Sequence, residues 1–440
     1  MGFSLKKLLS SEGTRVPHHK ETANFPTEQL PMPEKIIMPM SQHVGAPCTP
    51  CVAKGDQVYV GTMIGKLEGG MGMPIFSSVS GIVEKVQKLL HKTGKEDELV
   101  YIIPDGLQTP DPAIKPPVVT DYESFIDALS MSGIVGLGGA GFPTDKKIQP
   151  KNLAEIDTLL INGAECEPYL TTDNREMVEC SDSILYGIHA CLQFLGIPQA
   201  KICIEDNKPE AISILKEKTA DDPKVSICVL ESRYPQGAQN ILIHNATGRV
   251  VARGARHTSV GVIMLNVTTV SSIGKFLKTG MPLVSKRLTV AGDAIKNPKN
   301  LEVPIGTPMR DAIKYCGLNE EPAKIIVGGP MMGNAQMDDI YPITRQNNGL
   351  LVLTKKSAPK PAVTACIRCG KCVNSCPVGL TPLLILDAYQ NHDAAALDKY
   401  MADLCISCGT CSYVCPAKRP LTQYTTLAKT FLKNQKRGSR

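Results

Sequence analysis

Two cysteine runs near the end of the chain share one spacing: CIRCGKCVNSCP at 366–377 and CISCGTCSYVCP at 405–416. Each run has the form C-x2-C-x2-C-x3-C-P. This is the ligand pattern of paired [4Fe–4S] clusters, in which the fourth cysteine of one run binds the cluster of the other. The spacing therefore predicts a domain over 360–425 that holds two clusters and moves single electrons.

The predicted ligands divide into two crossed sets. The first cluster is predicted to take Cys366, Cys369, Cys372 and Cys415, and the second to take Cys405, Cys408, Cys411 and Cys376. Zinc sites also pair short cysteine motifs, but the third cysteine and the Cys-Pro of each run are surplus to a tetrahedral ion. Disulfides are disfavoured, because cysteines two residues apart bridge poorly and the other cysteines follow no pattern.

The composition indicates a globular chain without membrane spans. The chain has 440 residues, of which 42% are hydrophobic and 20% charged, and this length predicts about three domains. The sequence contains no run of about 18 apolar residues that could span a bilayer. The apolar stretch at its start is too short and is interrupted too early for a signal peptide. Sixteen cysteines without export indicate a reducing compartment, so we expect a protein in the cytosol or on the cytosolic face of a membrane.

The net charge of +6 gathers mostly at the ends of the chain. The tail at 426–440 carries Lys and Arg from position 429 on and no acid. It could touch anionic lipid or an acidic partner, but a solvated, disordered tail is the favoured interpretation of such a charge run. Aromatic residues are only 5% and no recognition motif is present, so nucleic-acid binding finds no support.

The first 33 residues are polar and rich in proline, which is typical of an extended arm. Over 34–108, short β-type runs broken by glycine predict a small all-β domain. Its pieces GDQVYVG, GKLEG and SSVSGIVEKV are similar to a biotinyl- or lipoyl-type barrel-sandwich hybrid. No modified lysine is evident, so we interpret it as a docking module. The lone CxxC of Cys48 and Cys51 is more typical of two unrelated thiols than of a site.

The middle of the chain alternates between helix and strand patterns. After a proline-rich linker, 118–280 begins with an amphipathic helix, a glycine loop, a strand at 158–162 and a helix at 173–195. This alternation predicts a Rossmann-like, mostly parallel sheet. Two strands, a helix and a strand over 281–350 suit a small β-grasp module. The predicted fold class is thus multidomain, with α/β and α+β parts.

The glycine loop GLGGAG at 136–141 satisfies G-x-G-x-x-G, but a helix precedes it and Phe-Pro-Thr follows it. The dinucleotide fingerprint needs a strand before and a helix directly after, so that interpretation fails. Glycines still let backbone N–H groups approach an anion, and Lys146 or Lys147 lies within reach of a phosphate. A tight turn without a ligand is the alternative.

The strand at 158–162 leads into Glu165 and Glu167. Ligands of open parallel sheets bind at the carboxyl ends of the strands. Two carboxylates suit ribose hydroxyls or a flavin ring better than phosphate, and a plain surface turn is the alternative.

Four stretches carry a resemblance to known proteins: GLGGAGFPT at 136–144, NGAECEPYLTTDNR at 162–175, RYPQGA at 233–238 and NVTT at 266–269. They resemble the flavin- and NADH-binding core of the complex I flavoprotein subunit. Together with the β-sandwich, the β-grasp module ending VGGPMMG and the cysteine runs, the chain resembles the C subunits of Rnf complexes, the ion-translocating ferredoxin:NAD+ oxidoreductases. The resemblance covers nearly the whole chain beyond the arm.

The resemblance implies a site for FMN, with NAD(H) as substrate. The loop that would wrap the FMN phosphate comprises Gly136, Gly138, Gly139 and Gly141, and Lys147 would reach the same phosphate. The flavin and the nicotinamide nucleotide would contact Asn162, Glu165 and Glu167, and the FMN site would be completed by Asn266 and Thr269. The chain departs from the complex I pattern at Ala164, where that pattern has an acid, and at Leu265, where it has an Asn.

The resemblance also implies a place in the cell: a peripheral subunit on the cytoplasmic side of the cell membrane. Its partners would be the membrane-embedded and iron–sulfur subunits of the complex, and ferredoxin indirectly. Hydride transfer needs no protein acid or base, so no catalytic residue is predicted. Two alternatives remain: a soluble NADH-dependent reductase of the cobalamin-reductase type, and an electron-wire or scaffold subunit without nucleotide.

Overall fold

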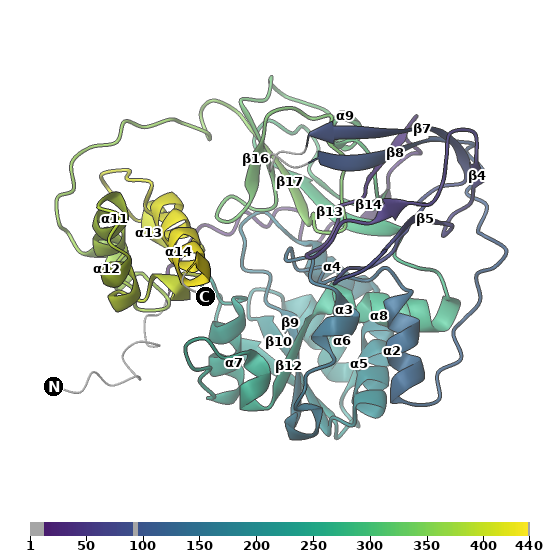
Figure 1. Ribbon diagram of the computed structural model, residues 1–440, viewed down its shortest axis with the longest axis horizontal. Coiled ribbons are helices and arrows are strands. Elements are labelled where there is room, and N and C mark those ends of the chain that lie inside the picture. Colours follow the sequence, from purple (N-terminus) through teal and green to yellow (C-terminus); the bar gives the residue numbers. More distant parts are fainter. Residues whose placement is uncertain (1–12, 91–95, 439–440) are drawn as a thin grey trace.

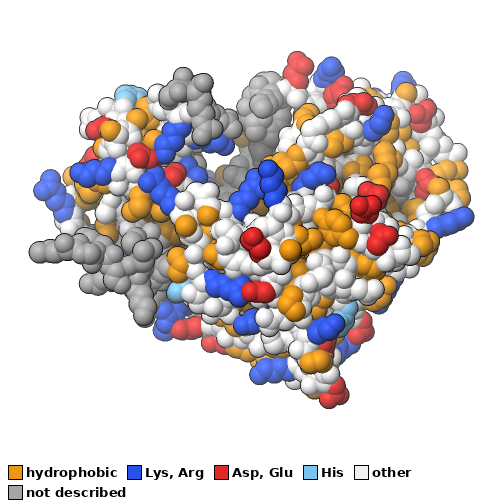
Figure 2. Space-filling view, turned by 60° about the horizontal axis from the view of Figure 1, so that its bottom comes forward, with side chains coloured by type: hydrophobic (Ala, Val, Ile, Leu, Met, Phe, Trp, Pro, Cys, Tyr) orange, Lys and Arg blue, Asp and Glu red, His pale blue; other side chains and the backbone are white. Residues whose placement is uncertain are grey.

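The computed structural model describes residues 13–90 and 96–438. They form four β-sheets and a separate helical lobe, which a long extended segment joins to the rest (Figure 1). Residues 1–12 of the predicted arm and residues 439–440 of the predicted tail lie outside this description. On the face that Figure 2 shows, side chains of both charges alternate over the larger body and gather in no single patch.

Two small sheets share one core in the N-terminal part. Their strand orders are β2-β8-β7-β4 and β3-β5-β6. Ile36 and Val100 of the first sheet pack with Ile64 and Ile75 of the second, all without solvent exposure. The strands are β2 (Ile36–Pro39), β3 (Thr49–Pro50), β4 (Gln57–Val58), β5 (Met63–Lys66), β6 (Ile75–Phe76), β7 (Gly81–Leu90) and β8 (Glu96–Pro104).

A parallel four-stranded sheet, β11-β10-β9-β12, forms the centre of the next domain. Its alternate residues enter two cores, one under α2, α5 and α8 and the other under α7, so both faces are covered as parallel strands require. The strands are β9 (Thr158–Gly163), β10 (Gln199–Glu205), β11 (Val225–Leu230) and β12 (Val262–Asn266). The helices are α2 (Tyr122–Ser130), α3 (Thr144–Lys147), η1 (Leu153–Glu155), α4 (Thr172–Glu179), α5 (Ser181–Leu195), α6 (Pro209–Lys218), α7 (Gln239–Thr247), η2 (His257–Val260) and α8 (Val267–Thr279).

The single helix predicted over 173–195 is wrong, because the chain leaves helical geometry at Cys180 (φ −124°, ψ 25°) and forms α4 and α5. The two helices pack against different parts of the chain. Helix α5 packs closely on α8, where a Cβ on Gly187 would come within 2.1 Å of the Val270 carbonyl oxygen. Helix α4 instead turns its buried carboxylates toward the next domain.

The third unit is a six-stranded sheet of order β1-β14-β13-β17-β15-β16 covered by α9. Its first strand, β1, comes from the N-terminal arm and pairs parallel with β14, so the arm is part of this sheet. The elements are β1 (Thr27–Gln29), β13 (Ser285–Ala291), β14 (Lys299–Pro304), α9 (Met309–Cys316), β15 (Lys324–Val327), β16 (Asn334–Gln336) and β17 (Gly349–Leu353).

Buried charges hold this sheet against α4. Arg287 of β13 pairs with Glu176, which also accepts from Lys275 at 2.8 Å. Although burial opposes it, these two cations lower the pKa of Glu176 to about 2. Removing one partner of such a buried pair costs about 3–5 kcal/mol, so the contact fixes the two domains relative to each other.

The C-terminal lobe is helical and contains both cysteine runs. Its elements are α10 (Lys371–Asn374), α11 (Pro382–Gln390), α12 (Ala394–Lys399), η3 (Ala402–Leu404), α13 (Thr410–Tyr413) and α14 (Leu421–Gly438). The prediction of a disordered tail is wrong for 429–438, which continue α14. Leu421, Thr425, Ala428 and Leu432 are buried at helical spacing, so one mostly apolar face packs onto the lobe, while Lys429, Lys433 and Lys436 are exposed.

The N-terminal arm is anchored at Lys20. Its ammonium donates to the carbonyl oxygens of Glu165 (2.8 Å), Glu167 (2.9 Å) and Leu170. His19 stacks on Tyr169 with ring centroids 4.6 Å apart. The arm thus fixes the loop that follows β9.

We predict that Lys20→Met lowers the free energy of unfolding by about 1.5–3 kcal/mol, because three carbonyl oxygens lose a charged donor. Thermal unfolding of the full chain measures this. Lys54→Met, at an exposed lysine of the N-terminal domain, is the matched control. Equal melting temperatures for the two variants would contradict the anchoring role.

Candidate functional site

The two cysteine runs fold into loops of the same shape. Arg368 and Ser407, each two residues after the first cysteine of its run, have φ of 54° and 55°, which non-glycine residues adopt only under constraint. Their N–H groups then point back to sulfur, from Arg368 to Cys366 Sγ at 3.3 Å and from Ser407 to Cys405 Sγ at 3.4 Å. The repeated strain is what we expect of loops shaped around a ligand.

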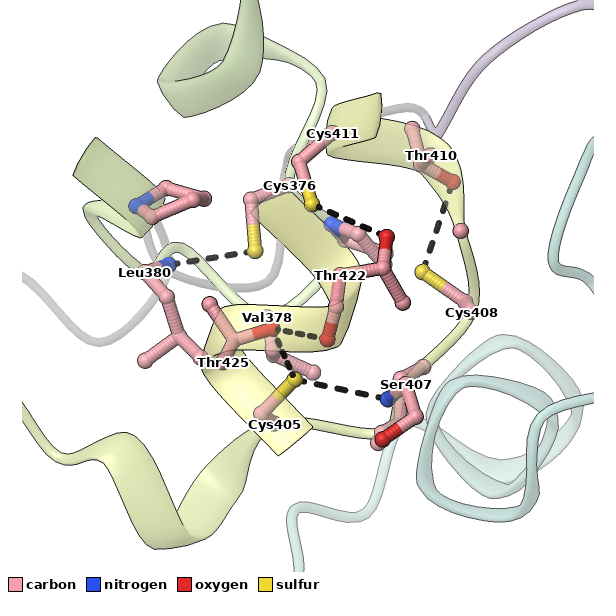
Figure 3. Close-up of a pocket in the computed structure, with 14 residues that line it drawn as sticks. Cys376, Val378, Leu380, Cys405, Ser407, Cys408, Thr410, Cys411, Thr422 and Thr425 are labelled. Carbon is pink, nitrogen blue, oxygen red and sulfur yellow. Dashed lines mark hydrogen bonds between the residues drawn. The ribbon is translucent and has the colours of Figure 1, made fainter. Parts of the chain in front are cut away.

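The lobe contains two hollows, and each is lined by one crossed set of cysteines. The first is lined by Cys366, Cys369, Cys372 and Cys415. The second is lined by Cys376, Cys405, Cys408 and Cys411. Figure 3 shows the four sulfur atoms of the second set turned toward one another around this hollow.

The donor sets suit a cluster better than a single ion. Over residues 13–90 and 96–438, no three Cys, His, Asp or Glu side chains converge tightly enough to hold one metal ion. A cube of four irons and four sulfides holds its thiolates farther apart, as the hollows do. Burial raises the pKa of Cys411 to about 12 and of Cys376 to about 11, so these thiols stay protonated at neutral pH unless a metal binds them.

Hydroxyl groups surround the second set. Thr425, Thr410 and Thr422 lie 3.3–3.5 Å from the sulfur atoms of Cys405, Cys408 and Cys411 (Figure 3). As thiolates, these sulfurs would accept hydrogen bonds from the hydroxyls, and such bonds tune the reduction potential of a cluster.

The two sets differ in their surroundings. Cys366 and Cys369 are exposed, whereas the second set has no exposed member. Cys408 packs with Tyr234 and Val16, and Cys166 and Met331 border this contact. The second set therefore faces the β9 domain, and the first set faces solvent.

The glycine loop is a closed turn between α2 and α3. Gly136 donates to Phe142 O at 2.8 Å, and Gly141 donates to Gly136 O at 3.0 Å. Gly139, at φ +103°, has open space where a Cβ would stand. Leu137 N–H donates to Thr269 Oγ1 at 2.9 Å, which fixes the loop to the first turn of α8. The loop thus presents a bare backbone beside a helix N-terminus, an arrangement that suits an anion.

Lys147 lies at the end of α3, next to this loop. Burial lowers the pKa of its ammonium to about 8. Among the described residues no carboxylate or hydrogen-bond acceptor pairs with it. A half-buried cation without a counter-charge suits a phosphate group, and the contact of Lys147 with FMN stays a prediction.

Polar side chains at the ends of β9 and β12 form one network. Asn266 caps α8 and donates to Asp173 at 2.8 Å, and Thr268 donates to Asp173 at 2.7 Å. Burial, with the nearby Glu165 charge, raises the pKa of Asp173 to about 6. Asn162 donates to Gly237 O at 2.9 Å. The structure thus brings Asn162, Asn266 and Thr269 to the same sheet edge as the glycine loop.

The two glutamates are engaged by the protein itself. Glu165, at φ 48°, accepts from the N–H of Asp173 (2.8 Å) and of Asn174 (3.2 Å) and so caps α4. Glu167 accepts from Met331 N–H at 3.1 Å, in the loop after β15. In this arrangement both carboxylates shape the site, and their predicted contacts to flavin and nicotinamide remain predictions.

Three units meet at Tyr234, a residue with 1% exposure. Its hydroxyl donates to the carbonyl oxygen of Cys408 at 2.7 Å and lies 3.5 Å from Glu167 Oε1. A Cβ on Gly409 would come within 2.6 Å of the Met331 carbonyl oxygen, so the backbones touch here. Arg253 binds Asp403 (2.6 Å) and Asp398 (2.8 Å) of the lobe.

Sequence reasoning assigned no role to Tyr234, Asp173 or Lys20. Tyr234 and Asp173 lie inside motifs that the sequence analysis quoted, but only the fold reveals which groups they contact. Lys20 carries no local signal, because its acceptors are main-chain carbonyls 145–150 residues away.

Family models match four parts of the chain: an RnfC barrel sandwich hybrid domain at 9–107, a Nuo51 FMN-binding domain at 129–275, an SLBB domain at 287–335 and a 4Fe-4S dicluster domain at 365–418. The C subunit of the Na+-translocating ferredoxin:NAD+ oxidoreductase complex of Acetobacterium woodii is 41% identical over 86% of this chain and 87% of its own length. The chain belongs to the family of C subunits of ion-translocating ferredoxin:NAD+ oxidoreductase complexes. It has the FMN-binding and dicluster domains of that family.

Other C subunits are similar over most of the chain. That of the proton-translocating complex of Clostridium ljungdahlii is 39% identical over 96% of this chain and 92% of its own. That of the ion-translocating oxidoreductase complex of Rhodobacter capsulatus is 37% identical over 83% and 72%. An air-oxidised NAD+-reducing [NiFe]-hydrogenase has a related fold, with a TM-score of 0.51 at 16% identity, covering 72% of this chain and 63% of the other.

These matches confirm the predicted fold class: a barrel-sandwich hybrid, a parallel flavin domain, a β-grasp module of the SLBB type and a two-cluster domain. They also confirm FMN and iron–sulfur clusters as the cofactors. The ligand residues of each cofactor remain predictions.

We predict that Cys415→Ser removes one cluster and leaves the other, because the second hollow keeps all four cysteines. Iron and sulfide content should fall by half, and electron paramagnetic resonance should show one cluster type. Cys51→Ser, at an exposed thiol outside the lobe, is the control. A variant that keeps both clusters would contradict the crossed ligand sets.

Proposed function

We propose that this chain passes electrons between NAD(H) and an iron–sulfur partner, as the peripheral, cytoplasmic-side subunit of a membrane complex whose other subunits translocate ions. The names of its relatives support this function over a soluble reductase, since each belongs to an ion-translocating complex. In the described part of the chain, no helix is long and apolar enough to cross a membrane.

The bound groups supply the redox chemistry: FMN exchanges electrons in pairs or singly, NAD(H) exchanges a hydride, and each cluster passes one electron. The protein supplies placement. The glycine loop, Lys147 and the first turn of α8 would hold the flavin, and the crossed cysteine sets would hold the clusters.

The contact at Tyr234 is the observation that carries this proposal. It joins the main chain of a cysteine in the second set to the loop that follows β9, where nucleotide ligands of parallel sheets bind. Arg253 and the two aspartates add a salt bridge at the edge of the same contact. Electrons would therefore pass between the flavin site and the second set, and then to the first set.

The first set would be the exchange point with the partner. Around it the surface is mainly basic and partly apolar: Arg368 and Lys371 are exposed beside the hollow, and Asp387 is the one carboxylate among its lining residues. Ile367 is 69% exposed and Leu384 42%. Apolar side chains within a positive rim suit weak, electrostatically steered contact with an acidic iron–sulfur protein or domain.

The test is anaerobic stopped-flow of the reconstituted full chain with NADH, comparing wild type with Tyr234→Phe. In wild type, flavin and clusters should both bleach. In the variant, flavin reduction should be unchanged and cluster reduction about 10- to 100-fold slower, because small misplacement of redox partners is costly. Tyr186→Phe, at an exposed tyrosine, is the control. Absent flavin bleaching in wild type would overturn the proposed function.

We predict that the double substitution Arg368→Glu and Lys371→Glu slows electron exchange with a small acidic two-cluster ferredoxin about tenfold or more at low salt. The difference should vanish at high ionic strength, because salt screens the attraction. The control, Lys296→Glu with Lys314→Glu, makes the same charge change at exposed lysines of the SLBB domain. Equal rates for the two double variants would contradict docking at the first set.

A further inference from the structure

Polar atoms without partners occur on α3, which follows the glycine loop, and on η2. His257 Nε2 and Thr144 Oγ1 are buried and have no hydrogen-bond partner among the described residues. Lys147 likewise has no partner there. Leaving one buried donor unsatisfied costs about 1–3 kcal/mol, so each of these buried atoms points to a missing partner.

Gln239 determines which nitrogen of His257 carries the proton. Its side-chain amide nitrogen, at the start of α7, faces His257 Nδ1. With the amide in this orientation its nitrogen donates to Nδ1, which assigns the ring proton to Nε2. Burial, with Lys147 and Arg256 nearby, lowers the pKa of His257 to about 4, so the ring is neutral at neutral pH. The buried Nε2 atom is therefore an N–H donor with nothing to donate to.

Local contacts hold His257 next to the end of α3. Asn152, five residues beyond Lys147, donates to Thr258 O at 2.9 Å, which fixes η2 against this segment. Asp145 of α3 pairs through Oδ2 with Lys146 at 3.1 Å, whereas its buried Oδ1 has no hydrogen-bond partner among the described residues. Among the described residues, no ion pair or hydrogen bond joins a carboxylate to Lys147 or to His257 Nε2.

We propose that His257, through Nε2–H, binds a phosphate group of the nucleotide together with Lys147. The inference rests on the proposed function and assigns to His257 a role that neither motif spacing nor resemblance indicated. Two phosphates have the required chemistry: the monoester of FMN and the pyrophosphate of NAD(H). Gln239 acts as a positioning residue, because it keeps the donor on Nε2.

The test compares ligands with and without phosphate on the flavin-free full chain. FMN and riboflavin are titrated by flavin fluorescence, and NADH and reduced nicotinamide riboside by nicotinamide fluorescence. His257→Phe should weaken FMN binding about 10- to 100-fold while leaving riboflavin binding unchanged, as expected for a lost hydrogen bond to a charged group. His257→Gln, whose amide can replace the donor, should restore most of the affinity.

The controls separate this inference from its premise. His189→Gln, at an exposed histidine of α5, should bind all four ligands as wild type does. If His257→Phe instead weakens the binding of NADH and leaves the binding of reduced nicotinamide riboside unchanged, His257 binds the pyrophosphate of NAD(H). The inference then stands, with the pyrophosphate as the bound group. If His257→Phe changes neither the affinity of FMN relative to riboflavin nor that of NADH relative to the riboside, the inference is overturned while the proposed function survives. Wild-type protein that binds neither FMN nor NADH would overturn both.

Discussion

A single buried hydroxyl joins the three functional units of this chain. Tyr234 bridges the backbone of Cys408, in the second cysteine set, and Glu167, whose carboxylate also binds the SLBB loop at Met331. Burial raises the pKa of Tyr234, so it remains a neutral donor. Electron transfer between separate sites depends on their separation, and this contact sets the separation of the dicluster lobe from the nucleotide loop. Together with the Arg253 salt bridges and the contact of Gly409 with Met331, it holds the second cysteine set against the loop that follows β9.

Other contacts hold the domains around Tyr234 in place. The buried Arg287–Glu176 pair fixes the SLBB sheet on α4. Lys20 fixes the loop between Glu165 and Leu170 to the N-terminal arm. Buried ion pairs add less net stability than they cost to break, and their value here is geometric. They hold the domains in fixed relative positions, which a relay between redox sites requires.

The sequence predicted the parts whose signals are local. The cysteine spacing predicted both crossed sets, each of which lines its own hollow, and the alternation around β9 predicted a parallel sheet with ligand groups at its carboxyl edge. It could not predict that Glu165 caps α4, since this depends on a positive φ and on where the helix starts. The basic residues after 428 concealed the apolar stripe of α14, and the tautomer of His257 depends on Gln239, eighteen residues away.

The central claim is the order of sites: nucleotide site, then the second cysteine set, then the first. Rapid freeze-quench electron paramagnetic resonance after mixing the reconstituted chain with NADH tests it most directly. The Cys415→Ser protein serves as the spectral reference for the second cluster. The account predicts that the signal of the second cluster rises first and that of the first cluster follows. A first cluster that is reduced before the second would contradict the account.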